Sequence, residues 1–270
     1  MRLFRGAGKK TTAERAKRLF DQAHAYYVSG SIAESVRCLE ALLHLTPNDL
    51  DVRLMLANEY SVLGRTNDAI REVSECLRRD PNNNEALGML GLFYCQQGDL
   101  RRGINYLERS AKGLSDSVSL SATLGTLGAA YHMLGDHQWA MKYWQASIQH
   151  NLQNFESHFC LGIVYIEEGH LDQALHEFQI AESLAPDKST MVYRAPEMMI
   201  EAIRTLTRKS NGSSEVIPSD GIAAVHGTDS SFGLGFNSRE VSHPNFCSLL
   251  SVVSITPKAV ILNDKTKTYP

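Results

Sequence analysis

Histidine and cysteine are the residues of this sequence with the widest chemistry, because they bind metal ions and act as nucleophiles or proton carriers. The chain has ten histidines and five cysteines. Neither the pair His132 and His137 nor the pair His170 and His176 has the i, i+4 spacing that places two ligands on one helix face. We therefore expect no metal site, and we assign these histidines solvated or capping roles.

Other chemical motifs are incomplete. The segment Gly6-Ala7-Gly8-Lys9-Lys10-Thr11 is similar to the end of a phosphate-binding loop, but Leu3 stands where the first glycine is required. The sequence has no nucleophile elbow, no zinc-binding helix and no glycine-rich loop following a strand. It therefore predicts no catalytic site and no cofactor, so an enzyme is the least favoured class. The odd number of cysteines, with no C-x-x-C pair, is typical of a reduced, intracellular protein.

The elements that would position any site follow an internal repeat, which glycine, tyrosine and a small residue mark at fixed intervals. A tyrosine stands four residues before each marker glycine, and a small residue three before each tyrosine. The small residue lets two helices approach closely, and the glycine ends the first helix in the left-handed conformation. The five sets are Ala23, Tyr26 and Gly30; Ala57, Tyr60 and Gly64; Gly91, Tyr94 and Gly98; Gly128, Tyr131 and Gly135; and Gly162, Tyr165 and Gly169.

A second helix is predicted after each glycine, because a small residue is followed four positions later by a large apolar one. Examples are Ala140 with Trp144 and Ala174 with Phe178. Prolines at Pro47, Pro81 and Pro186 close three of the units. Three additional residues lie before the fourth unit, and we expect them to form a longer turn over Lys112 to Val118.

The pattern resembles the tetratricopeptide repeat family, whose unit is a helix-turn-helix; stretches such as Leu90-Gly91-Leu92-Phe93-Tyr94 and Leu161-Gly162-Ile163-Val164-Tyr165 carry the resemblance. It implies an all-α fold: a right-handed α-solenoid of five helix-turn-helix repeats with a C-terminal capping helix and a largely disordered tail. We expect the capping helix to begin at Pro196, since proline is tolerated in a first helical turn. The expected divisions are a flexible basic arm (1–15), five repeats (16–49, 50–83, 84–120, 121–154 and 155–188), the capping helix (189–210) and the low-order tail (211–270).

The resemblance also implies that certain positions of each first helix line a concave groove. These positions are largely apolar or small, which suits an apolar peptide or an amphipathic helix. We expect Phe159, Ile163, Met55, Met89 and Leu92 to supply most of the contact area. The full set predicted to bind a partner is Phe20, His24, Tyr27, Leu54, Met55, Asn58, Met89, Leu92, Thr126, His132, Phe159, Cys160 and Ile163.

Two known uses of this fold do not fit these residues. Family members that bind chaperone C-termini use a clamp of Lys, Asn and Arg, but Phe20 and His24 stand at the first such positions. Asn58 alone does not form the asparagine ladder of the sugar-transferring members. The remaining hypotheses are an adaptor or assembly scaffold for a protein or peptide client, and a self-associating scaffold that forms homo-oligomers. A groove filled by its own side chains or by the tail is the structural alternative to both.

The composition gives further expectations. Of the residues, 43% are hydrophobic and 21% charged, with a formal net charge of −3, which does not favour a nucleic-acid partner. No run of 18 apolar residues predicts a membrane span, and no signal peptide is evident, so we expect a cytoplasmic location. The basic arm is the one segment where weak contact with an anionic membrane is expected.

Overall fold

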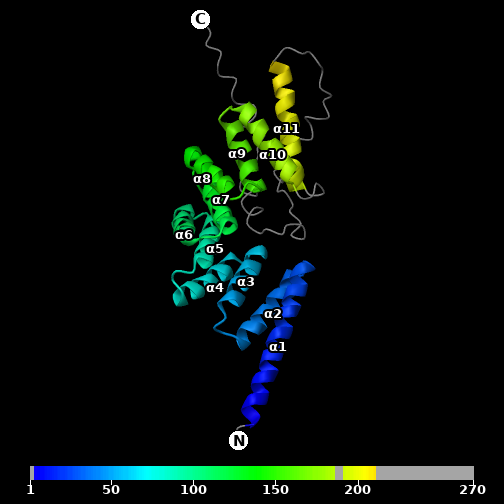
Figure 1. The fold of residues 1–270 in the computed structure, drawn as a ribbon, viewed down its shortest axis with the longest axis vertical. Coiled ribbons are helices and arrows are strands. Elements are labelled where there is room, and N and C mark those ends of the chain that lie inside the picture. The colour runs from blue at the N-terminus through cyan, green and yellow to red at the C-terminus, as the bar shows by residue number, and fades with distance from the viewer. Residues whose placement is uncertain (1–2, 186–190, 211–270) are drawn as a thin grey trace. The chain divides into compact units, whose positions relative to one another are not determined.

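The computed structural model describes residues 3–185 and 191–210, and within these ranges every regular element is an α-helix (Figure 1). This confirms the predicted all-α class. The helices are α1 (Leu3–Val28), α2 (Ile32–Leu45), α3 (Leu50–Val62), α4 (Thr66–Arg79), α5 (Asn84–Gln96), α6 (Leu100–Gly113), α7 (Ser117–Met133), α8 (His137–His150), α9 (Phe155–Glu167), α10 (Leu171–Leu184) and α11 (Met191–Ser210).

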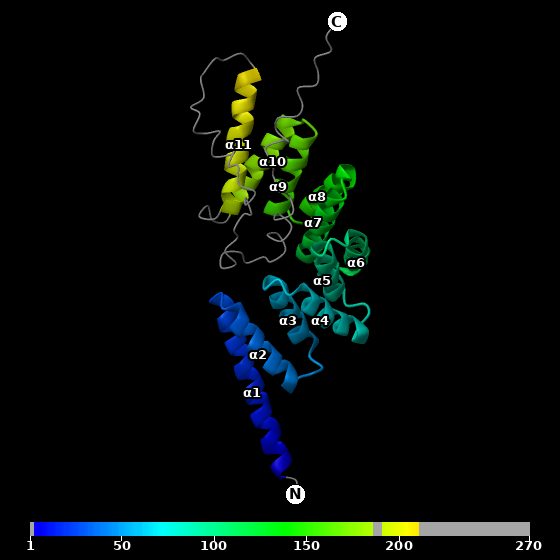
Figure 2. The ribbon, with the colours of Figure 1, turned by 180° about the vertical axis from the view of Figure 1, so that it is seen from behind.

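Consecutive helices pair into five antiparallel hairpins: α1 with α2, α3 with α4, α5 with α6, α7 with α8, and α9 with α10 (Figures 1 and 2). The chain divides between Ser115 and Asp116 into two compact units. The first contains α1 to α6, in which α2 also contacts α3 and α4 contacts α5. The second contains α7 to α11, in which α8 contacts α9 and α10 contacts α11.

The turn inside each hairpin depends on the predicted glycine. Gly30, Gly64, Gly98, Gly135 and Gly169 all have φ between 73° and 83°, a left-handed conformation that costs other residues free energy. In the second repeat the N–H of Gly64 donates to Ser61 O (2.9 Å) and the N–H of Arg65 donates to Tyr60 O (2.8 Å). This pair of bonds is a Schellman motif, which satisfies carbonyl groups that a helix end otherwise leaves unpaired.

The small-residue column packs as predicted. A Cβ atom added to Gly128 would lie 2.6 Å from Trp144 Nε1, and one added to Gly162 would lie 2.7 Å from Phe178 Cε1. The glycines therefore let the large apolar side chain of the second helix lie directly on the backbone of the first. Trp144 uses this proximity to donate a 3.0 Å hydrogen bond from Nε1 to Gly125 O.

The three additional residues lengthen a helix instead of a turn, contrary to our expectation. Residues 114–116 separate α6 from α7, whereas residues 80–83 separate α4 from α5. Helix α7 has 17 residues and α5 has 13. Asp116 starts the longer helix by accepting hydrogen bonds from the N–H groups of Val118 (3.0 Å) and Ser119 (3.2 Å), so the added residues join the helix in place of a loop.

The ends of the helical array also differ from the sequence predictions. Residues 3–15, expected to form a flexible arm, lie in helix α1, whose 26 residues extend past the 14 of α2 (Figure 1). Helix α11 begins at Met191, so Pro196 lies inside it. Its ring is fully buried, and this apolar packing offsets the single backbone hydrogen bond that a proline removes.

Helix α11 packs against α10, with Ile200 and Ile203 buried. Tyr193 extends the contact to α9, where its ring meets Phe155 edge-on with 5.1 Å between ring centroids. The position of α11 is that of the predicted capping helix. The expected low-order tail, 211–270, lies outside the described residues.

Candidate functional site

The predicted groove-lining positions of the first unit, which we call its inner face, begin on α1, where three of the predicted partner-binding residues are exposed. Phe20 is 42% exposed and Tyr27 is 36% exposed, and His24 lies between them one helical turn from each. Apolar side chains of this size are usually buried. This stretch of α1 is thus a surface available to a partner.

The predicted residues on α3 and α5 divide into buried and half-buried members. Leu54 and Leu92 are buried and belong to the core. Met55, Asn58 and Met89 are half-buried. The two methionines occupy equivalent positions 34 residues apart on α3 and α5, which contact each other, and so form the part of the predicted groove that a ligand could reach in this unit.

In the second unit the predicted residues contribute mainly to packing. Phe159 is 1% exposed, and its ring meets Phe178 of α10 edge-on at 5.4 Å. Ile163 and Thr126 are buried as well, and Thr126 donates its hydroxyl proton to Ala122 O within α7 at 3.0 Å. We expected Phe159 and Ile163 to supply contact area to a partner, but both side chains are buried and expose almost no surface.

The pKa values of the thiols of Cys95 and Cys160 are raised in this environment. Burial raises the pKa of Cys95 to about 12, with a smaller contribution from the charge of Asp99. Burial likewise raises the pKa of the half-buried Cys160, with Glu156 adding to the effect. Because the thiolate is the nucleophile, neither cysteine is activated.

Neighbouring first helices are joined by a lateral contact that recurs at one repeat position. In the first unit Ser61 of α3 donates its hydroxyl proton to Gln96 Oε1 of α5 at 3.2 Å. In the second unit His132 Nε2 of α7 lies 2.9 Å from Glu167 Oε2 of α9. Both pairs are 35 residues apart, so the same place in the repeat carries different chemistry in the two units.

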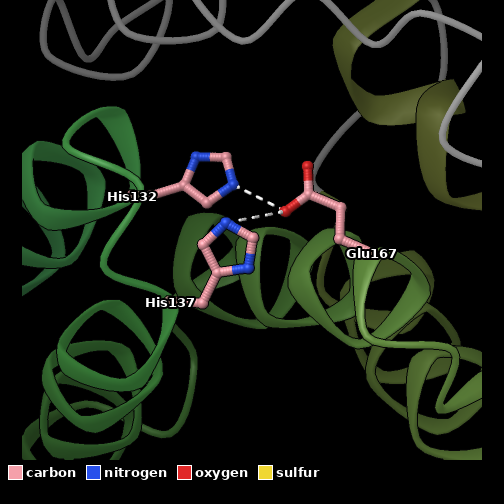
Figure 3. A group of neighbouring side chains, drawn as sticks. All are labelled: His132, His137 and Glu167. Carbon is pink, nitrogen blue, oxygen red and sulfur yellow. Dashed lines mark hydrogen bonds and ion pairs between the residues drawn. The ribbon is translucent and has the colours of Figure 1, made fainter.

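The contact in the second unit includes a third side chain. His137 Nε2 lies 3.7 Å from the same Glu167 oxygen, and the two imidazole rings stack with centroids 5.3 Å apart. Figure 3 shows both rings directed at this one carboxylate oxygen. The ligand atoms of His132, His137 and Glu167 all lie within 4.8 Å of one another; we call these three residues the histidine cluster.

Sequence reasoning missed the histidine cluster because it considered ligands on a single helix. His132 lies near the end of α7 and His137 begins α8, and the turn at Gly135 (φ 79°) reverses the chain between them. Glu167 comes from the next repeat. The available signal was the position of the two histidines on either side of a predicted turn glycine, with an acid at the equivalent end of the next first helix.

A surface hollow of about 430 Å³ lies along α4. Its charged groups are already paired: Arg53 with Glu72 at 2.6 Å, and Arg78 with Glu75 at 2.7 Å. Because these charged groups already bind one another, they are not available to bind a charged ligand. We therefore assign no function to this hollow.

Comparison with known proteins identifies the family. The family model described as Tetratricopeptide repeat matches residues 8–160, more than half of the chain, and the chain belongs to this family. Such proteins generally act as protein-interaction scaffolds and not as enzymes.

Individual relatives are distant. The chain is 24% identical to the TPR repeat-containing protein MJ1428 of Methanocaldococcus jannaschii, over 76% of this chain and 36% of that protein. It is 23% identical to the anaphase-promoting complex subunit CDC16 of Saccharomyces cerevisiae, over 72% of this chain and 24% of that protein. The chain thus spans about a third or less of the length of these curated relatives.

A solved structure agrees on the fold. The thermophilic TPR protein TTC0263 of Thermus thermophilus superimposes with a TM-score of 0.58 at 18% identity, covering 70% of this chain and 99% of that one. Among the described helices, none has the length and apolar character needed to cross a bilayer.

Proposed function

We propose that the chain is an adaptor or assembly scaffold that binds an apolar or amphipathic segment of a protein client on the inner face of its first unit. The observation that carries the proposal is the set of accessible apolar side chains at inner-face positions of α1, α3 and α5: Phe20 and Tyr27 are exposed, and Met55 and Met89 are half-buried. The proposed setting is the cytoplasm, with a protein and not a nucleic acid as the partner.

The chemistry of this face favours a client helix with one apolar side. Methionine side chains adapt to different apolar partners because they are unbranched and polarizable. Asp51 and Glu85, at equivalent positions near the starts of α3 and α5, are exposed, and they favour basic residues on the client's polar side. A relative named as a complex subunit, CDC16, is in keeping with a role in assembly.

The test uses peptides selected from a random library on the immobilised full chain. Their affinities are then measured by calorimetry for the wild-type chain and for the double variant Met55→Asp with Met89→Asp. We expect this variant to keep its far-UV circular dichroism and to lose at least about tenfold in affinity, because a charge is placed in each apolar contact. Leu152→Asp is the matched control, since Leu152 is 73% exposed and lies in the second unit.

Equal affinity for the double variant and the wild-type chain would contradict the assignment of this face. So would an equal loss in the Leu152→Asp control, which would indicate a nonspecific effect of added charge.

Self-association is the second candidate, and one observation favours it. Tyr26 is 40% exposed, whereas Tyr60, its equivalent in the next repeat, is 3% exposed and donates to Glu40 Oε1 of α2 at 2.6 Å. Tyr26 has no such neighbour among the described residues, and a second copy of the chain could provide one. Sedimentation of the wild-type chain, of Tyr26→Asp and of a chain lacking 211–270 tests this; a monomer at every concentration for the wild type would rule it out.

A further inference from the structure

We propose that the histidine cluster binds a divalent transition-metal ion of the Zn²⁺ class at the junction of the fourth and fifth repeats. The donor set is two imidazole nitrogens and one carboxylate oxygen, a combination that suits Zn²⁺ and neighbouring transition metals. This inference does not depend on the proposed client-binding face, which lies in the other unit.

The three ligands are held by elements that converge independently of any metal. Gly135 reverses the chain so that the end of α7 and the start of α8 present their histidines on the same side. Helix α9 packs against both α7 and α8 and brings Glu167 to them from the next repeat. His132 is further positioned by Trp144, whose ring lies 5.8 Å from the imidazole between centroids.

The distances are close to those that a metal ion requires. Four ligands placed tetrahedrally about 2.0–2.2 Å from Zn²⁺ lie roughly 3.3–3.6 Å from one another. Here the Glu167 oxygen is 2.9 Å from His132 Nε2 and 3.7 Å from His137 Nε2. All three donor atoms lie within 4.8 Å of one another, so we expect side-chain rotations to bring them to a common centre.

Neighbouring groups complete the arrangement. Glu168 adds a second carboxylate beside the cluster: its Oε1 atom lies 4.0 Å from His137 Nδ1, beyond hydrogen-bond distance. The side chains of His137 and Glu167 are 34% and 26% exposed, which gives an ion a path of entry and leaves a fourth coordination position to water.

Metal binding requires one change of tautomer. His132 Nε2 is 2.9 Å from the carboxylate oxygen and holds the proton of that hydrogen bond. On binding, His132 carries its proton on Nδ1, and the lone pair of Nε2 coordinates the ion. With the proton of His137 on Nδ1 as well, both rings bind as neutral imidazoles and Glu167 binds as a carboxylate.

A simple hydrogen bond between repeats is the alternative explanation. It accounts for His132 and Glu167, because Ser61 and Gln96 make such a bond at the equivalent position. It does not account for His137, which approaches the same oxygen from the neighbouring helix. The convergence of three donor atoms, and not the single bond, is what favours a metal ion.

The test uses the full chain without an affinity tag, with Zn²⁺ as the probe in calorimetry and Co²⁺ as a spectroscopic probe. The informative variant is His137→Ala, and the matched control is His150→Ala, since these two residues are the first and last of the same helix. His150 is exposed and lies outside the cluster. Glu167→Gln is a second variant, which keeps the size of the side chain and weakens it as a ligand. Far-UV circular dichroism checks that each variant is folded.

We expect one Zn²⁺ to bind the wild-type chain and the His150→Ala control equally, and to bind His137→Ala and Glu167→Gln at least about tenfold more weakly. Zn²⁺ should also raise the melting temperature of the wild-type chain, because an ion that binds only the folded state stabilises it. The Co²⁺ complex should show ligand-field absorption without the charge-transfer bands of thiolate ligands. Equal Zn²⁺ affinity for wild type and His137→Ala, or an unchanged wild-type melting temperature, would overturn the proposal.

Discussion

The carboxyl group of Glu59 lies buried between α2 and α3, with a side chain 3% exposed. Its Oε1 atom is 2.8 Å from the Ser35 hydroxyl oxygen, which is also 2.8 Å from Ala23 O. The hydroxyl has one proton, and the carbonyl of Ala23 can only accept it. The single hydroxyl proton of Ser35 is therefore shared between Ala23 O and Glu59 Oε1, so it stabilises an ionised carboxylate only in part. Burial favours the protonated carboxyl and raises the pKa of Glu59 to about 7, and the hydrogen bond from Ser35 opposes this only in part.

This raised pKa predicts a specific pH dependence of stability. Between the ordinary pKa of a glutamate, 4.5, and about 7, the folded chain holds a proton on Glu59 that the unfolded chain has lost. The free energy of unfolding contributed by this group therefore falls as pH rises through that window. Glu59→Gln, which keeps the size of the side chain and is never ionised, should become more stable relative to wild type as pH rises from 5 to 8, by on the order of 2–3 kcal/mol.

Urea unfolding of both chains across this pH range provides the measurement. The difference between the two chains isolates Glu59 from acids such as Glu75, whose pKa is lowered to about 2 by Arg78 and Arg79. A difference that is the same at every pH would show that Glu59 is ionised in the folded chain.

At the scale of helices, Asn154 joins three elements of the second unit. Its Oδ1 accepts a 2.9 Å hydrogen bond from the N–H of Ser157 and so caps the start of α9. Its Nδ2 donates to Ser121 Oγ of α7 at 2.9 Å and to Ser147 Oγ of α8 at 3.1 Å. The two serines are fully buried and each donates to the backbone carbonyl of the other, so Asn154 adds a further donor to an existing buried network.

We expect Asn154→Ala to destabilise the chain by about 2–4 kcal/mol, because it removes a cap and leaves buried hydroxyl groups with fewer partners. Asn83→Ala is the matched control. Asn83 caps α5 by accepting from the N–H of Ala86 at 2.9 Å, and its loss should cost about 1 kcal/mol. Denaturant unfolding followed by circular dichroism measures both values, and equal costs would show that the network contributes nothing beyond the cap.

Most helices of the repeats could be predicted from the sequence, whereas some helix boundaries could not. The repeat was predictable because its signals are local: a glycine that must adopt positive φ, and a small residue that accommodates a large side chain of the next helix. Residues 1–15 were assigned to a flexible arm because they carry an excess of basic groups. Basic residues are good helix formers, however, and each helical glycine costs only about 1 kcal/mol, so residues 3–15 continue α1. The three additional residues before the fourth repeat include no proline that would stop a helix. Asp116 is the N-cap of α7, so these residues become part of that helix.

The candidate sites were less predictable. The pattern identifies which face of a helix a residue occupies but not how deeply it is buried, and Phe159 therefore proved to be a packing residue with 1% exposure. The histidine cluster depends on a turn and on a lateral neighbour 35 residues away. Neither relation is visible in the spacing of ligands along one helix.

At the scale of the whole chain, the division between Ser115 and Asp116 predicts two folding units. Each repeat is stabilised mainly by its neighbours in the array, and each unit contains its own set of neighbouring helices. We expect residues 1–115 and 116–270, expressed separately, each to retain helical circular dichroism and to unfold cooperatively. A fragment with no helical signal would show that its unit cannot fold alone.

The lateral contact between first helices has a consequence for how such an array can vary. Ser61 with Gln96 and His132 with Glu167 occupy one register position, outside the small-residue columns that hold each hairpin together. Two substitutions at this position would exchange a neutral bond for an ionisable one without changing the small residues of those columns. The strength and pH dependence of the contact between two neighbouring repeats can therefore change at a single interface, while the packing inside each helix pair stays the same.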